Sequence, residues 1–395
     1  MFYETLFDIY RNKFLQYRLV GMFNNNSNYN FLIMCNTAIT IPESNGPEAG
    51  FDEWFLTAIN GGALMLMISI GHRTGLFDTM SVMGWTNSKN LADQAGLNER
   101  YVREWLGAMA TGGIVEVDET GKYRLPKEHA GFLTRESEQE NLAAFGQYIS
   151  ILGNVEDDIL HCFQNGGGVP YEKYPRFHEV MAEDSGMTVL DALEDHILPL
   201  IPEITDKLKS GIHVLDLGCG RGRAILKMAE LFPESTFKGI DLSEEAISWA
   251  QREAEKRELQ NAEFEVRDAS NFDRTAEPGK FDFVTTFDAI HDQAKPLSVL
   301  KGINRTLKPG GIYLMQDIHS SGQVHNDMDH PMGPLLYTIS CMHCMSVSLA
   351  QGGEGLGAMW GREKALELLE KAGFDDIQIH RLDHDIQNDY YVITA

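Results

Sequence analysis

Apolar residues recur at intervals of three and four along the first periodic stretch of the chain, which begins at Phe51. This spacing predicts a helix over residues 51–71. Residues 63–70 are apolar on nearly every face of that helix. We therefore expect it to be buried on all sides, either in a core or against a second subunit. The periodic positions are Phe55, Ile59, Ala63, Leu66 and Ile70.

Two shorter helices and a pair of strands follow this helix. Asn87 or Ser88 can cap a short helix that ends at Gly96, and a second helix starts after Asn98. Residues 114–125 then alternate as two strands joined by a turn of sequence ETGK. Helix, short helix, helix and hairpin is the order of a winged-helix domain.

Changes of pattern divide the chain into four parts. Residues 1–50 are rich in Asn and aromatic residues and lack periodicity, which predicts a poorly ordered N-terminal extension. Residues 51–135 form the expected winged-helix and dimerisation domain, and residues 136–205 form a helical connector. Residues 206–395 alternate strands with helices, which indicates an α/β fold with a Rossmann-like, doubly wound parallel sheet.

Four of the predicted strands have an acidic residue at their carboxyl end. The first of these strands runs into a glycine-rich loop, in the segment HVLDLGCGRG. Glycine is needed where a ligand lies against bare backbone and where a strand turns sharply into a helix. Acids at strand ends often cap helices. Four in register behind such a loop instead indicate a ligand site at the carboxyl ends of the strands. The four acids are Asp216, Asp241, Asp268 and Asp288.

Composition narrows the range of partners. The chain has 395 residues, with 33 Lys and Arg against 58 Asp and Glu, for a formal net charge of −25. This excess of acid argues against binding nucleic acid or an anionic membrane, because both need a basic surface. The apolar stretch at 63–70 is far shorter than the ~20 residues of a spanning helix. Five cysteines are too few, and odd in number, for a disulfide framework. We therefore expect a cytoplasmic protein.

The segments LDLGCGRG, GIDLS, RDAS and LKPGG resemble, in order, the motifs of class I S-adenosylmethionine-dependent methyltransferases. A nicotinamide dehydrogenase more often has G-x-G-x-x-G, whereas this chain has D-x-G-x-G-x-G. The resemblance covers residues 206–395. It extends to about residue 55 for a subgroup with an N-terminal winged-helix domain, which is found in mycobacteria and invertebrates and is sometimes labelled as regulators. It implies a seven-stranded sheet, with S-adenosyl-L-methionine as the methyl donor.

The resemblance also implies which residues bind this cofactor. Each assignment applies to a position that matches a family motif. The implied contacts are the methionine portion for Asp216, Gly218, Gly220 and Gly222, the ribose for Asp241, the adenine for Leu242, Asp268 and Ala269, and the reacting end for Phe287.

His291 and Asp288 are the candidate catalytic residues. Both follow the fourth predicted strand, where the acceptor and the methyl group should meet. Methyl transfer from a sulfonium needs a base only if the acceptor arrives protonated, and a histidine can remove such a proton near neutral pH. The alternative is that His291 only caps or packs.

Residues 318–360 look like a substrate lid inserted between the fifth and sixth strands. Cys341, His343 and Cys344 invite a metal interpretation, but a helical C-x-x-C without a second pair is a weak zinc signal. We expect no metal, and whether these three residues bind anything stays open. Methionines are expected to line the lid, although they could equally be core residues. They are Met332, Met342, Met345 and Met359.

The resemblance implies methyl transfer to a small-molecule acceptor by in-line displacement. We expect a homodimer that pairs through residues 55–135. A small thiol is the first choice, because of the methionine-rich lid and the absence of a conspicuous base dyad. O-methylation of a hydroxylated small molecule is the alternative. A second alternative is a DNA-binding regulator that senses S-adenosylmethionine. The winged-helix segment lacks the basic stripe that such a regulator needs. We therefore expect no nucleic-acid partner and no membrane partner.

Overall fold

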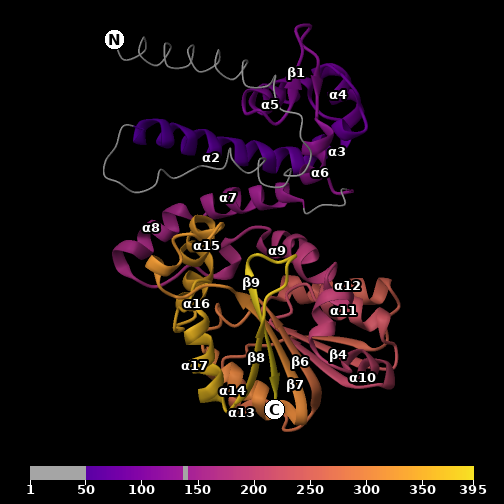
Figure 1. The fold of residues 1–395 in the computed structure, drawn as a ribbon, viewed down its shortest axis with the longest axis vertical. Helices are drawn as coiled ribbons and strands as arrows, with labels where there is room; N and C mark the ends of the chain where they lie inside the picture. The colour runs from indigo at the N-terminus through magenta and orange to yellow at the C-terminus, as the bar shows by residue number, and fades with distance from the viewer. Residues whose placement is uncertain (1–49, 137–140) are drawn as a thin grey trace, which may run out of the picture. The chain divides into compact units, whose positions relative to one another are not determined.

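The computed structural model describes residues 50–136 and 141–395 (Figure 1). Apart from Gly50, the expected extension over residues 1–50 lies outside the described residues. The chain divides at residue 62 into two units, and the second unit, Ala63–Ala395, holds the elements that form the site.

Helix α2, Phe51–Thr74, confirms the predicted helix and continues for three further residues. Its buried residues are Ser69, Gly71 and His72, so this chain's own core does not surround the helix. The other expected alternative, burial against a second subunit, stays a prediction. Leu66 and Ile70 are 44% and 46% exposed. By length and composition α2 could also span a membrane, although we expected no segment to be long enough.

The winged-helix elements match the predicted order. Asn87 caps α4 by accepting a hydrogen bond from the backbone N–H of Asn90, and Asn98 caps α5 in the same way through Arg100. The two strands pair antiparallel, which confirms the hairpin. The elements are α3 Leu76–Ser81, α4 Ser88–Ala95, α5 Glu99–Thr111, β1 Glu116–Val117, β2 Tyr123–Arg124 and α6 Lys127–Leu133.

The connector is helical, as expected, and contacts the end of α2. Nε2 of the buried His72 lies 2.6 Å from Oε1 of Glu183. The side-chain amide of Gln147 donates a hydrogen bond to Oε2 of Glu183 at 2.8 Å. Two π-helical turns, Gly186–Leu190 and Leu193–Ile197, follow the last regular helix. The connector helices are α7 Gly146–Gly153, α8 Glu156–Asn165 and α9 Phe177–Ser185.

Seven strands form one sheet in the order β5-β4-β3-β6-β7-β9-β8. The strands β5, β4, β3, β6 and β7 run parallel to one another, whereas β9 pairs antiparallel with both β7 and β8. The sheet is therefore mixed, which corrects the expectation of a wholly parallel sheet. The strands are β3 His213–Leu217, β4 Thr236–Asp241, β5 Ala262–Val266, β6 Phe281–Phe287, β7 Leu307–Ile318, β8 Asp376–His380 and β9 Asn388–Thr394.

Alternate residues of each strand enter the cores on opposite faces of the sheet, as the two-residue repeat of a strand requires. Val214 and Phe283 pack in one core, and their neighbours Leu215 and Val284 pack in the other. The first face carries α10, α11 and α12, and the second carries α13, α14 and α17 (Figure 1). These helices are α10 Ile204–Ser210, α11 Arg223–Leu231, α12 Glu244–Lys256, α13 Phe272–Thr275, α14 Pro296–Thr306 and α17 Arg362–Ala372.

A helical insertion separates β7 from α17, at the place predicted for the lid. It contains α15 Gly333–Ile339, a π-helical turn Ser340–Cys344 and α16 Met345–Ala350. The π turn carries Cys341, His343 and Cys344 toward the connector, where His343 stacks on Phe177.

Candidate active site

A cavity of about 840 Å³ lies at the carboxyl ends of the parallel strands. Eight of the nine expected cofactor-binding residues line it, and so does Asp288. The lining residues among the expected set are Asp216, Gly218, Gly220, Asp241, Leu242, Asp268, Ala269, Phe287 and Asp288.

The glycine loop leaves bare backbone facing this cavity. Gly220 has a φ of 53°, and a Cβ placed on it would meet no atom within 4 Å. Its N–H donates to Oδ2 of Asp241 at 2.8 Å, so the end of β4 holds the loop that follows β3. A side chain at Gly220 would therefore fill space that a ligand can use, and the loop fits a cofactor held against its backbone.

Gly222 has a different position from the other two loop glycines. It does not line the cavity but precedes the first residue of α11, with a φ of 62°. A Cβ at this position would lie 2.2 Å from the ring of Phe264. The close packing of α11 against the sheet therefore explains this glycine without a ligand contact.

Asp216 and Asp241 differ in their surroundings. Asp216 is buried at the end of β3 and accepts a hydrogen bond from Thr285 at 2.8 Å. Burial raises the pKa of Asp216 to about 7, while the Thr285 hydroxyl acts in the opposite direction. Asp241 instead accepts backbone N–H groups from Gly220 and Ser243, which orient its carboxylate at the cavity wall.

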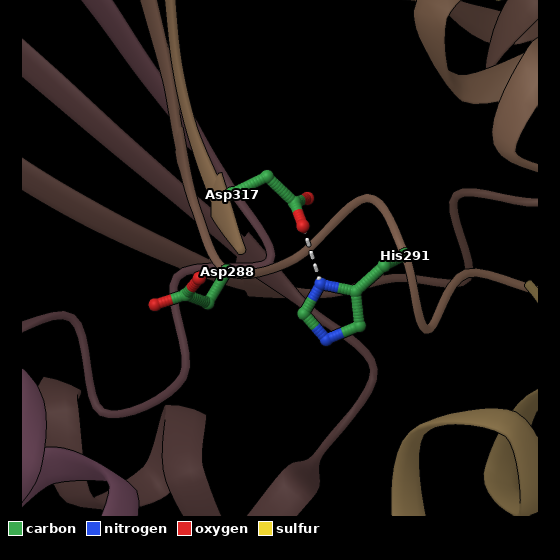
Figure 2. A group of neighbouring side chains, drawn as sticks. All are labelled: Asp288, His291 and Asp317. Carbon is green, nitrogen blue, oxygen red and sulfur yellow. Dashed lines mark hydrogen bonds and ion pairs between the residues drawn. The ribbon is translucent and has the colours of Figure 1, made fainter. Parts of the chain in front are cut away.

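His291 and Asp317 form a buried dyad (Figure 2). Nδ1 of His291 donates to Oδ1 of Asp317 at 2.8 Å, and the indole N–H of Trp360 donates to the same oxygen at 2.9 Å. Burial alone would lower the pKa of His291. The carboxylate of Asp317 and the thiol of Cys344 outweigh burial and raise that pKa well above its usual value. The dyad holds the ring so that Nε2 is left to exchange a proton.

Asp288 lies beside the dyad in a strained conformation. Its φ is 48°, a left-handed value that costs a residue with a side chain about 1–3 kcal/mol and is common at functional sites. Burial, together with the nearby charge of Asp317, raises the pKa of Asp288 well above its usual value. One side-chain nitrogen or oxygen atom from each of Asp288, His291 and Asp317, of the kind that can bind a metal ion, lies within 4.8 Å of the others. The carboxyl group of Asp288 nevertheless points away from the imidazole (Figure 2).

Two segments of the chain match known protein families. Residues 62–135 match the Rv2258c-like winged HTH domain, and residues 208–373 match a methyltransferase domain. Residues 208–373 therefore carry a methyltransferase domain. The expected α/β class, with a winged-helix domain in front of a Rossmann-like sheet of seven strands, is confirmed.

Curated relatives match the methyltransferase domain over part of their length. An uncharacterized methyltransferase of Synechocystis is 30% identical over 154 residues, which are 37% of this chain and 65% of the relative. A ubiquinone biosynthesis O-methyltransferase of Thiobacillus denitrificans is 36% identical over 26% of this chain and 42% of the relative. This chain thus spans less than two-thirds of these relatives.

Solved structures share the fold over most of their length. Human N-acetylserotonin methyltransferase in complex with SAM is 19% identical, with a TM-score of 0.63 over 89% of this chain and 99% of that one. An O-methyltransferase family protein from Burkholderia thailandensis is 17% identical, with a TM-score of 0.59 over 88% of this chain and 98% of that one. At these identities the likeness concerns the fold.

A second, smaller cavity of about 80 Å³ adjoins the first and is lined by residues of both the connector and the methyltransferase domain. The two cavities share five lining residues, and both candidate catalytic residues, Asp288 and His291, line the smaller one. The shared residues are Phe177, Met181, Ser185, Asp288 and Asp292.

The expectation of a methionine-lined lid is wrong for both cavities. Among the described residues, the methionine that lines them is Met181 of α9, and none comes from the lid. The lid residues that line the smaller cavity are Ile318, Leu336, Ile339, His343, Cys344 and Ala358.

Sequence reasoning missed Asp317 and Asp292. Asp317 lies next to the last residue of β7, a strand end like those of the four predicted acids, so its position in the pattern could have indicated it. Asp292 lines both cavities and accepts a hydrogen bond from Tyr171. The sequence does not indicate that Tyr171 contacts Asp292, because this hydrogen bond joins two distant segments, the connector and the loop after β6.

Proposed function

We propose that this chain transfers a methyl group from S-adenosylmethionine to a hydroxyl group of a small molecule. The buried dyad of His291 and Asp317 carries this proposal, because a hydroxyl acceptor has to lose a proton and the dyad offers a base. The sequence argument for a thiol relied on a methionine-lined lid and on the absence of a base dyad. Neither premise holds, so the O-methyltransferase alternative becomes the first choice.

The smaller cavity supplies the acceptor position in this proposal. His291 and Asp288 line it, and it shares residues with the large cavity, which the expected cofactor-binding residues line. When bound there, S-adenosylmethionine supplies an electrophilic methyl group. Holding acceptor and methyl group in line provides much of the catalysis, since proximity is worth about 7–11 kcal/mol in well-oriented reactions.

His291 accepts the proton of the acceptor hydroxyl at Nε2, while its Nδ1–H remains bonded to Asp317. The carboxylate of Asp317 stabilises the imidazolium that forms and fixes the tautomer of the neutral ring. Trp360 and the backbone N–H of Ile318 hold the carboxylate in place, at 2.9 Å each. Asp317 is thus a positioning residue, and His291 is the base.

A small thiol is the second candidate acceptor. The smaller cavity, at about 80 Å³, is below the ~150 Å³ of a cavity that binds benzene, so it favours a compact reacting group. A thiol also ionises more readily than an alcohol and would depend less on the dyad. The dependence of turnover on His291 therefore distinguishes the two acceptors.

The test is formation of S-adenosylhomocysteine from a panel of small phenols and thiols, with wild type, Asp241→Ala and His291→Asn. We expect turnover on a phenol, loss of cofactor binding in Asp241→Ala, and a kcat about 10²–10⁴-fold lower in His291→Asn with cofactor affinity unchanged. His325→Asn is the matched control, because His325 is exposed and lines neither cavity.

Turnover on phenols that survives His291→Asn would contradict the assignment of the base. Turnover on thiols alone, unaffected by His291→Asn, would favour the second candidate. A protein that binds the cofactor and methylates no member of the panel would contradict O-methylation of a small phenol.

A further inference from the structure

Two carboxyl groups lie where the large and the smaller cavity meet. Asp288 and Asp292 are the ionisable members of the five residues that line both cavities. Burial raises the pKa of Asp292 to about 6. Burial and the nearby charge of Asp317 raise the pKa of Asp288 well above its usual value. Asp292 is therefore the carboxyl group that ionises more readily at this junction, and near neutral pH it is mostly charged.

Neighbouring groups place Asp292 between the two ends of the expected reaction. The charge of His291 acts to lower the pKa of Asp292, and the charge of Asp241 acts to raise it, so both residues lie near its carboxyl group. Nε2 of Gln293, the next residue, would lie 3.9 Å from a Cβ placed on Gly218. Asp292 thus lies among the residues expected to contact the ribose, the methionine portion and the acceptor. The sulfonium of S-adenosylmethionine joins its ribose to its methionine portion, so it belongs in this place.

Tyr171 of the connector orients the carboxylate of Asp292. The Tyr171 hydroxyl donates a hydrogen bond to Oδ2 of Asp292, and the Tyr171 ring stacks on His178 with centroids 5.6 Å apart. This hydrogen bond opposes the effect of burial and favours the ionised carboxylate. Oδ1 of Asp292 accepts a long hydrogen bond, at 3.4 Å, from Nε2 of Gln293. That weak bond leaves Oδ1 available to attract a cation.

The positively charged side chains around the cavities have other partners. In the described part of the chain, arginines line the large cavity, none lines the smaller one, and Asp292 forms no salt bridge with Lys or Arg. His291 is a basic residue of the smaller cavity, and Asp317 balances its charge when the ring is protonated. The arginines of the large cavity and their partners are Arg176 with Glu179, Arg221 with Glu245, Arg223 with the backbone oxygen of Ala182, and Arg267 with Thr275.

We propose that Asp292, oriented by Tyr171, recognises the positive charge of the sulfonium of S-adenosylmethionine. When the methyl group moves to the acceptor oxygen, the electron pair of the broken bond stays on sulfur, and the hydroxyl proton goes to His291. The sulfur is then a neutral thioether, and its attraction to Asp292 is lost. Asp292 therefore favours the donor over the product S-adenosylhomocysteine and promotes their exchange. This inference rests on the proposed methyl donor and not on the acceptor.

Calorimetric titration without an acceptor tests this preference. The probes are S-adenosylmethionine, S-adenosylhomocysteine and sinefungin, in which a carbon bearing a protonated amine replaces the methylated sulfur. Asp292→Asn should weaken the binding of the two cationic ligands about tenfold or more, and should not weaken the binding of neutral S-adenosylhomocysteine. Tyr171→Phe should change the same ratio by a smaller factor, because the carboxylate remains but loses its fixed orientation.

Asp268→Asn is the matched control, because it makes the same chemical change at a carboxylate that lines the large cavity alone and is expected to contact the adenine. It should weaken all three ligands by the same factor. If Asp292→Asn does not fold, the ratio in Tyr171→Phe decides. An equal loss for cationic and neutral ligands at position 292, or an unchanged ratio there, overturns the inference, and so does a wild type that binds none of the three.

The inference and the proposed O-methylation fail differently. An unchanged ratio of donor to product affinity in Asp292→Asn, with turnover on a phenol, contradicts the role of Asp292 and leaves O-methylation in place. A ratio that falls as expected, in a protein that methylates none of the phenols, contradicts O-methylation and leaves the role of Asp292 in place.

Discussion

The protonation state of His291 depends mainly on the carboxylate of Asp317, with Cys344 acting in the same direction. Burial acts to lower the pKa of the imidazole and Asp317 acts to raise it, with a net effect well above the usual value. A base works only when deprotonated, so kcat/KM should rise with pH through an apparent pKa above the ordinary ~6.5 of histidine. Asp317→Asn removes the main raising influence and should move this pKa to lower pH while kcat falls.

Profiles of kcat/KM against pH for wild type and Asp317→Asn measure this shift. Asp327→Asn is a useful control, because it makes the same chemical change at a lid residue that lines neither cavity. A profile that is superimposable in wild type and Asp317→Asn would show that the dyad does not set the protonation of the base.

At the scale of the element, the turn from β3 to α11 holds two glycines with different expected roles: Gly222 allows close packing, and Gly220 is proposed to bind the cofactor. Gly222→Ala places a Cβ 2.2 Å from Phe264 at a positive φ. Strain and overpacking should together lower the free energy of unfolding by about 2–5 kcal/mol. Gly220→Ala meets no neighbour, so it should cost about 1–2 kcal/mol and mainly weaken cofactor binding.

Denaturant unfolding and calorimetric titration with S-adenosylmethionine measure the two effects. Each variant serves as the control for the other, since both add one methyl group at a left-handed position of the same loop. Equal losses of stability in the two variants would contradict the division of roles.

Much of this element-scale structure could be predicted because its causes are local. Asn87 and Asn98 cap helices within three residues, and alternating apolar residues mark the strands. The antiparallel β9 depends on pairing with β7 over a long stretch of chain, so alternation could not reveal its direction. The stacking of His343 on Phe177 likewise joins distant segments and has no signature in sequence.

At the scale of the whole molecule, the exposed apolar surface of α2 indicates association. Leu66 and Ile70 are almost half exposed on a helix with few buried residues. We propose that two copies pair through this surface. Leu66→Glu with Ile70→Glu should then shift the protein from dimer to monomer in light scattering, because charges are costly in an apolar interface.

Val82→Glu is the matched control, since Val82 is 82% exposed outside α2 and its replacement should leave the dimer intact. A monomeric wild type, or a dimer that persists in the double variant, would contradict pairing through α2. The same measurement in detergent-free and detergent-containing buffer would separate pairing from a membrane role for this helix.

The contact between His72 and Glu183 has a consequence for the evolution of proteins that combine these two domains. Glu183 adjoins Asp184, so the end of α2 is anchored one residue away from an acid of the smaller cavity. Recombination between two related genes at the end of the winged-helix domain would replace His72 without replacing Glu183, or the reverse. Substrate range should therefore be inherited with both domains together, and chimaeras should retain it only when both halves come from one parent.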